Sequence, residues 1–448
     1  MSKNHHGTKN SEPTTPFKDI VALDAPTFRN SVRVLTLGGV DFTLWDVTKA
    51  ALAARLNMGL YGKAGSGKSQ LCADIQSLFG NNASYVLGRN DLNIKSLYQQ
   101  LKFKALTDAM QNGGTVSQKD LTELTADIYR PLLVVEEINR CVEVVQNQFF
   151  NIFEGFLELD GTKYPLGSSW IATFRDLGGC ELTENLRYSV GVWSANSGGE
   201  YTGTVSIDKA MKERSHLILN TNNFLLEPSD IDTVIFGSGG EVRLKDRDDP
   251  EDKTSLFVAA YEFLKQQAYS SPNYKEMGLE ALLSRYFIRG LDYIPCEAAR
   301  NSKTIMEEVW PEKAEEDNIG TDDETKLLYR MVAPASARGT LTIISLARAL
   351  RAYALAKDTK AEPDVVDSVI ESFKLVGAYS GMVGNPHRLR EDYVGNSYLA
   401  ALAIGDILRR RLQGKKDLME AIIYFKKEAK PLNDKILDEC QGEYACFR

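Results

Sequence analysis

One segment of the chain has the composition and spacing of a phosphate-binding loop. It matches the pattern GxxxxGK[ST] at every position and consists of Gly62, Lys63, Ala64, Gly65, Ser66, Gly67, Lys68 and Ser69. Glycines let backbone N–H groups converge on phosphate oxygens, and the N-terminus of a following helix adds positive potential. We expect Lys68 to reach the β and γ phosphates of a nucleotide and the Ser69 hydroxyl to ligate Mg²⁺. The alternative is an accidental glycine-rich turn.

Two carboxylates follow the next strongly apolar run, Leu132 to Val135. If this run is a central strand, Glu136 and Glu137 emerge at its carboxyl end, where α/β sheets bind their ligands. We assign Glu136 to Mg²⁺ and Glu137 to the general base that polarises the attacking water. Two solvated glutamates at a helix start are the alternative. No NKxD guanine signature follows in the sequence, so ATP is the expected nucleotide.

Five short apolar runs, separated by helical patterns, are expected to position these residues. They are residues 57–61, 83–87, 132–135, 190–194 and 216–219. Short buried runs that alternate with helices indicate a parallel sheet. The fold class predicted is therefore α/β, with a five-stranded parallel core followed by a mostly α-helical lid and C-terminal region.

Shifts in composition divide the chain into five parts. We expect a flexible tail over residues 1–17, a nucleotide-binding core over 18–225, an acidic and glycine-rich insert over 226–255, a helical lid over 256–380 and a helical extension over 381–448. In the lid, apolar residues from Gly339 to Lys357 recur at helical spacing.

The composition of the 448-residue chain is that of an ordinary globular protein, with 43% hydrophobic and 25% charged residues. Lys and Arg number 53 against 61 Asp and Glu, and this net charge of −8 argues against nucleic acid as a partner. The six cysteines form no CxxC pair, and four histidines leave little material for a His-based metal site. The N-terminus is polar and we find no run of about 18 apolar residues, so we expect a cytoplasmic protein without a membrane span.

Residues 136–140, Glu-Glu-Ile-Asn-Arg, resemble the DEINR signature of MoxR-type AAA+ ATPases, and the resemblance runs with interruptions from about Leu37 to Ala356. Residues 90–92 are similar to the PDL motif of that family, and a helix is expected over 139–156. An Asp-Gly turn between apolar strands predicts a hairpin over 156–166. Its placement resembles the helix-2 insert of the MoxR group, although an ordinary surface hairpin is the alternative.

The resemblance implies roles for three further residues. Asn196 follows a strand similar to sensor 1 and would orient the lytic water, or else stabilise a turn. Arg214 precedes the last strand, as an arginine finger does, and would reach the γ-phosphate of a neighbouring subunit. Arg338 lies in a segment similar to sensor 2 and would reach from the lid to the phosphates. A solvated helix-end arginine and a surface ion pair are the alternatives for the two arginines.

The resemblance also implies a homo-oligomeric ring, expected to be a hexamer, that remodels or matures a protein client. The best-known clients of that family carry a von Willebrand A domain. Several positions depart from the family pattern: Glu136 replaces the usual Asp, residues 168–187 are longer than the usual connection to sensor 1, and the chain from about Gly381 matches no motif. A nucleic-acid motor and a slow nucleotide-gated scaffold are the alternative functions.

Overall fold

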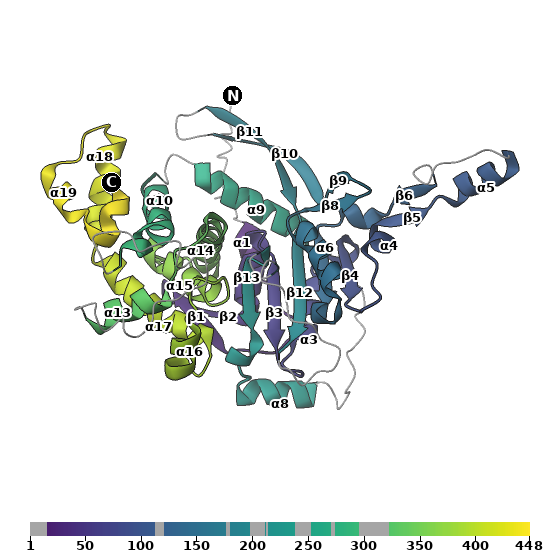
Figure 1. The fold of residues 1–448 in the computed structure, drawn as a ribbon, viewed down its shortest axis with the longest axis horizontal. Helices are drawn as coiled ribbons and strands as arrows, with labels where there is room; N and C mark the ends of the chain where they lie inside the picture. The colour runs from purple at the N-terminus through teal and green to yellow at the C-terminus, as the bar shows by residue number, and fades with distance from the viewer. Residues whose placement is uncertain are drawn as a thin grey trace, which may run out of the picture.

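The chain is built around a five-stranded parallel sheet with helices packed against it (Figure 1). The computed structural model describes residues 16–112, 121–175, 180–197, 211, 214–237, 252–269, 274–294 and 322–448. The sheet has the order β13-β3-β12-β7-β4, and its strands are β3 (Met58–Gly62), β4 (Ala83–Leu87), β7 (Leu132–Glu136), β12 (Val190–Asn196) and β13 (Leu217–Asn220). The predicted fold class and all five strands are confirmed.

The register of the sheet brings its carboxyl ends together. Asn196 at the end of β12 is paired with Gly62 at the end of β3, and Leu87 at the end of β4 is paired with Glu136. Val134 and Val192 in the central strands are fully buried, as expected for a sheet covered on both faces. One edge of the sheet therefore carries both the phosphate-loop segment and the two glutamates.

The N-terminal segment packs against this core. It contains α1 (Pro16–Val21), an antiparallel hairpin of β1 (Arg33–Leu37) and β2 (Val40–Thr43), and α2 (Leu44–Ala53). Phe17 in α1 is fully buried, so the expected flexible tail over 1–17 is wrong at its last two residues, because this apolar ring is covered by other parts of the fold. Residues 1–15 lie outside the described residues.

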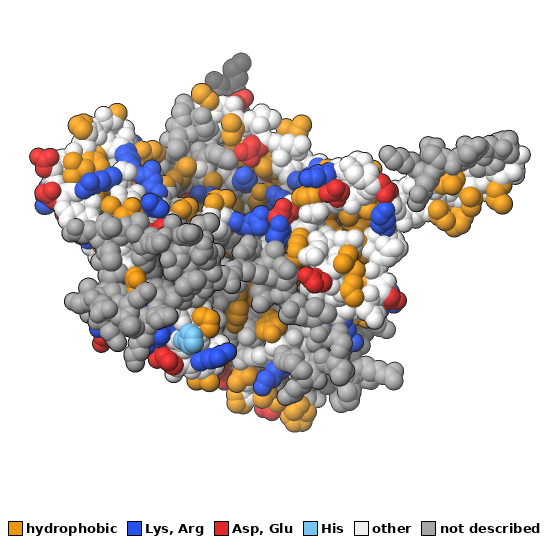
Figure 2. All heavy atoms as spheres, viewed as in Figure 1, with side chains coloured by type: hydrophobic (Ala, Val, Ile, Leu, Met, Phe, Trp, Pro, Cys, Tyr) orange, Lys and Arg blue, Asp and Glu red, His pale blue; other side chains and the backbone are white. Residues whose placement is uncertain are grey.

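A slender arm projects from the body between β4 and β7 (Figure 1). It consists of α4 (Ile94–Tyr98), β5 (Gln99–Leu101), α5 (Phe103–Asn112) and β6 (Thr122–Leu124), and β5 pairs with β6. Apolar side chains gather along its underside in Figure 2. Phe103 and Met110 are among the exposed apolar residues of α5. The sequence patterns did not predict this arm.

The predicted hairpin over 156–166 is present as β8 (Phe156–Leu159) and β9 (Thr162–Pro165), joined by Asp160 and Gly161. The sequence analysis compared this hairpin with an insert in the second helix of the core, and the order of the elements along the chain does not agree with that comparison. An insert in the second helix of the core interrupts the connection between the second and third strands, here β4 and β7. The arm occupies that connection, whereas the hairpin follows β7 and α6 (Glu143–Phe153).

A second antiparallel strand pair, which lies almost entirely in the segment 168–187 that the sequence analysis singled out, precedes β12. Its strands are β10 (Ser168–Arg175) and β11 (Glu181–Tyr188), which are antiparallel and extend at the top of Figure 1.

Helix α6 is shorter than the expected 139–156 helix. The backbone of Glu137 is left-handed and Val142 is extended, so a short 3₁₀ turn, η3 (Ile138–Arg140), separates the strand from the helix.

The described residues that follow β13 are mostly helical, as predicted. Their helices are α8 (Pro228–Gly237), α9 (Thr254–Tyr269), α10 (Tyr274–Ile288), α13 (Asp323–Met331), α14 (Ala337–Lys357), α15 (Val365–Gly377), α16 (Pro386–Tyr393), α17 (Ser397–Gln413), α18 (Lys416–Lys427) and α19 (Asp434–Glu439). The expected insert over 226–255 contains α8, whose apolar residues Ile231 and Phe236 are exposed, and its residues 238–251 lie outside the described residues. The chain also forms 3₁₀ turns: η1 (Gly80–Asn82), η2 (Ala126–Tyr129), η4 (Thr221–Asn223), η6 (Gly290–Tyr293) and η7 (Gly442–Phe447).

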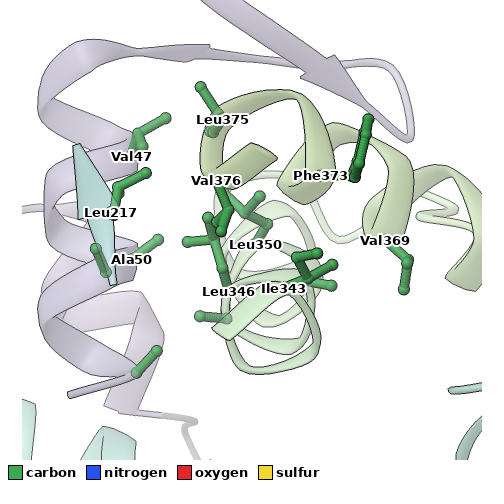
Figure 3. Close-up of a cluster of buried hydrophobic side chains, with 14 of the residues drawn as sticks. Val47, Ala50, Leu217, Ile343, Leu346, Leu350, Val369, Phe373, Leu375 and Val376 are labelled. Atoms are coloured by element: carbon green, nitrogen blue, oxygen red, sulfur yellow. The ribbon is translucent and has the colours of Figure 1, made fainter. Parts of the chain in front are cut away.

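Helix α14 packs against both α15 and α2 (Figure 3). Leu346 and Leu350 of α14 lie beside Val376 of α15, and Val47 of α2 lies across from them in this buried cluster. At the far end of α14, Lys357 Nζ donates to Asp46 of α2 at 2.9 Å, and Tyr353 donates to the same carboxylate. The helical region is thus fixed to the element that leads into β3.

Candidate active site

The phosphate-loop segment follows β3 and ends in α3 (Lys68–Ser77), the strand–loop–helix context that the motif requires. Gly65 and Gly67 have left-handed backbones, with φ of 77° and 82°, which glycine adopts at little cost. None of the described side chains caps α3 at Gly67. The first N–H groups of the helix are therefore not used by a cap and form an anion-binding terminus.

Lys68 lies inside this loop. Its Nζ donates to the carbonyl oxygens of Gly62 at 2.9 Å and Lys63 at 2.6 Å, and Ser66 Oγ lies 3.3 Å away. Burial lowers the pKa of Lys68, and the charge of nearby Glu137 opposes that shift. A phosphate group would supply the negative charge that the buried ammonium lacks, so the residue fits the role predicted for it.

Glu136 and Ser69 meet at the mouth of the loop. The Ser69 hydroxyl donates to the Glu136 carboxylate, while burial and the neighbouring Glu137 raise the pKa of Glu136 overall. Hydroxyl and carboxylate oxygens are ligands that Mg²⁺ accepts, and a divalent cation would offset the cost of the buried charge. The two residues therefore fit Mg²⁺, with Glu136 providing the longer side chain in place of Asp.

Glu137 is held in a left-handed backbone conformation, with φ of 54°. Its backbone N–H donates to Ser194 Oγ of β12 at 3.2 Å, and its carboxylate accepts from Asn196 Nδ2 at 3.4 Å. Arg140 pairs with the same carboxylate, with Nε 2.8 Å from Oε2. The structure thus brings together Glu137 and Asn196, which the sequence assigned separately, beside the phosphate loop.

A glycine that the sequence analysis did not identify fixes the backbone positions of Glu136 and Glu137. Gly88 follows β4, and its N–H donates to the Glu136 carbonyl at 2.7 Å. A Cβ at this position would lie 2.3 Å from the Glu137 carbonyl oxygen and 3.0 Å from that of Glu136. The close approach of two backbones requires glycine here, because any larger residue would push the acidic pair away.

Two polar residues after β13 also contact the loop and were not predicted. Thr221 Oγ1 lies 2.6 Å from Ser66 Oγ, and Asn222 Oδ1 accepts from the Lys63 N–H at 2.9 Å. A Cβ on Gly62 would meet Thr221 Oγ1 at 2.1 Å. The signal that could have found them is their position directly after a parallel strand, where the same rule located Glu136.

Arg214 and Arg338 lie at the opposite edge of the sheet, where the strands begin. Asn57, which directly precedes β3, donates through Nδ2 to the Arg214 carbonyl at 3.2 Å. From Asn57 to Gly62 the strand rises by about 16 Å, and the phosphate loop extends further. Arg338 shares a carboxylate partner with Arg214, namely Glu154. In this structure Arg338 therefore lies away from the phosphate loop of its own chain, because its end of α14 packs beside the strand starts.

The sheet order, the loop after β3 and the carboxylates at the end of β7 are those of a P-loop nucleotide-binding core. In agreement, residues 57–156 match the family model described as AAA domain (dynein-related subfamily). This match supports an AAA+ P-loop core over that segment and does not separate the MoxR type from other AAA+ proteins.

The chain is also similar to a crystal structure of a candidate ATPase from Cytophaga hutchinsonii, with 12% sequence identity and a TM-score of 0.49. The similarity covers 80% of this chain and 87% of that one. The comparison with curated proteins gives no match. In the part of the chain that the structure describes, no helix combines the length and apolar character needed to cross a membrane.

Proposed function

We propose that the protein is a MoxR-like AAA+ ATPase that couples ATP binding and hydrolysis in a ring to the remodelling of a partner protein. The observation that carries this proposal is the convergence of Lys68, Ser69, Glu136, Glu137 and Asn196 at one edge of the sheet. These groups supply phosphate charge, two Mg²⁺ ligands, a base and a polar amide, which together suit phosphoanhydride hydrolysis.

Hydrolysis would proceed by attack of water on the γ-phosphorus of ATP. Glu137 accepts a proton from that water as the new P–O bond forms and the bond to the β-phosphate oxygen breaks, which gives ADP and phosphate. Asn196 lies within 3.4 Å of the Glu137 carboxylate and would orient the water. Arg140 holds the same carboxylate in this structure, so the base becomes available when this half-exposed ion pair opens.

A ring would give the two distant arginines a phosphate partner. Arg214 and Arg338 lie at the strand-start edge, about 16 Å or more from the phosphate loop of their own chain. In a head-to-tail ring, this edge of one subunit would face the nucleotide of the next, and two guanidinium groups would stabilise the charge that develops on the γ-phosphate. We propose a hexamer in the cytoplasm, with a client that carries a von Willebrand A domain, on the resemblance alone.

Complementation between two inactive variants tests this proposal. Glu137→Gln should bind ATP but lower its hydrolysis by roughly 10²-fold or more, because the amide cannot accept the proton. Arg214→Ala should also bind ATP and hydrolyse it poorly. When the two are mixed, an interface with Glu137 from one subunit and Arg214 from the other is complete, so activity should partly return.

The proposal would be overturned by a wild-type protein that stays monomeric with ATP at micromolar concentration and hydrolyses it at full rate. A DNA-stimulated ATPase rate would instead favour the nucleic-acid motor. A pull-down with the Glu137→Gln protein, which should hold ATP and its client together, can then identify whether a von Willebrand A domain protein binds.

A further inference from the structure

Glu154 occupies an unusual position between the two arginines. It directly follows α6, and its Oε1 lies 2.9 Å from Arg214 Nε and 2.8 Å from Arg338 Nη2. One oxygen atom of one carboxylate therefore connects the segment before β13 with the first turn of α14, two segments that are far apart in the sequence.

The local helix does not explain an acidic residue at this point. The carboxyl end of a helix carries partial negative charge, so a carboxylate there is opposed by the helix dipole, whereas a cation would be favoured. Glu143 at the other end of α6 has the favourable placement. Glu154 must obtain its stabilisation from the arginines that it contacts.

The surroundings of Glu154 are strongly cationic. It lines a cavity of about 540 Å³ together with Arg55, Lys265, Arg348 and the two arginines, and among the described lining residues it is the one carboxylate. Burial, with Arg338 and Arg55 nearby, lowers the pKa of His216 in this cavity to about 4, so this imidazole is neutral at pH 7. Arg348 and Lys265 pair with Glu280 and Glu184, which do not line the cavity, whereas Arg214 and Arg338 pair with Glu154.

Glu154 contacts the two arginines through different guanidinium nitrogens. Its carboxylate lies close to Arg214 Nε, the guanidinium nitrogen nearest the chain, and to Arg338 Nη2. The Arg214 guanidinium also lies over the Phe150 ring, 5.1 Å from its centroid. Phe150 and Glu154 are four residues apart and so lie on one side of α6. Two contacts from the same helix therefore fix the Arg214 side chain.

We propose that Glu154 is a positioning residue that holds Arg214 and Arg338 as a pair, oriented for the nucleotide phosphates of a neighbouring subunit. This inference rests on the proposed function, because it gives Glu154 a role only if Arg214 acts across an interface. Without Glu154, two guanidinium groups would repel each other and sample other rotamers, and the geometry that the transition state needs would be reached less often.

The test is Glu154→Gln, which keeps the side-chain size and removes the charge. We expect kcat for ATP hydrolysis to fall by about tenfold or more, while KM and nucleotide affinity stay close to wild type. Glu154→Asp, which keeps the charge on a shorter side chain, should restore part of kcat and also serves if Glu154→Gln does not fold. Glu143→Gln on the same helix is the matched control and should leave kcat unchanged.

A mutant-cycle comparison separates positioning from a general structural role. In a background that carries both Arg214→Ala and Arg338→Ala, Glu154→Gln should cause little further loss, because the two residues through which it acts are gone. An equal fold-loss in both backgrounds, or wild-type kcat in the folded Glu154→Gln and Glu154→Asp proteins, would overturn the inference. If Arg214→Ala itself keeps full activity, the proposed ring function fails instead, so the two failures are distinguishable.

Discussion

Gly88 offers the sharpest test of the acidic pair, because its substitution perturbs Glu136 and Glu137 without touching their side chains. An added Cβ would lie 2.3 Å from the Glu137 carbonyl oxygen, whereas ordinary contacts begin at 3.4 Å. In Gly88→Ala the two backbones must therefore separate by roughly 1 Å. Since Glu137 already has a left-handed backbone, it has few alternative conformations into which to move.

The size of the effect follows from this displacement. A shift of about 1 Å in catalytic geometry can cost on the order of 10²-fold in rate, and overpacking of this kind costs about 1–3 kcal/mol of stability. Lys68 is held by the carbonyl oxygens of Gly62 and Lys63 at the end of β3, which β12 and β7 separate from β4, so ATP should still bind. We therefore expect a folded protein with retained ATP affinity and a strongly reduced kcat.

The assay compares steady-state ATP hydrolysis with equilibrium binding of a fluorescent ATP analogue, well below the melting temperature of each protein. Gly278→Ala is the matched control, because its Cβ would also be crowded, 2.7 Å from the Ile423 side chain, in the helical region. It should change stability but not kcat. A Gly88→Ala protein that is folded and turns over ATP at the wild-type rate would refute the reasoning that this contact fixes the acidic pair.

Three further predictions concern single side chains. Lys68→Ala should abolish measurable ATP binding in a folded protein, as judged by calorimetry and circular dichroism, because Lys68 supplies phosphate charge. Glu136→Gln should raise the Mg²⁺ concentration needed for half-maximal hydrolysis; if Glu136→Gln abolishes turnover and Glu137→Gln does not, the two roles are exchanged. His216 has a pKa lowered to about 4 by burial, so the unfolded chain takes up its proton first. Stability should accordingly be full above pH 6.5 and fall by about 3 kcal/mol toward pH 4 in denaturation curves, with a flatter dependence in His216→Gln.

Local sequence signals predicted the sheet and one half of the site well. Each of the five strands is a short apolar run, and the apolar composition of the run alone predicts that the strand is buried. The positions of the residues at the ends of β3 and β7 then follow from the positions of the strands. The role of Asn196 is implied by the resemblance, and the structure places this residue at the same edge because β12 and β3 are neighbours and their ends are in register. The positions of side chains at strand ends can therefore be predicted from the sequence.

Long-range packing decided what the sequence patterns missed. The position of Arg338 depends on how α14 packs against the sheet, and the pattern of α14 itself carries no information about that direction. Gly88 matters because of a backbone 49 residues later in the chain. In the arm, Phe103, Leu106 and Met110 of α5 do recur at helical spacing, and the sequence analysis did not use this signal. Helix α6 is shortened by the left-handed backbone at Glu137, which no propensity favours for Glu.

Helix α14 mechanically connects Arg338 with the contact between its last turn and α2. Its first turn carries Arg338, and its last turn is tied through Lys357 to Asp46 in α2. A helix of 21 residues is about 30 Å long and behaves as a stiff rod over that length. A tilt of about 10° around the Asp46 anchor would swing Arg338 through about 5 Å. A small rotation of α14 at the end beside α2 thus moves Arg338, at the other end of the helix, by a distance comparable to the length of a side chain.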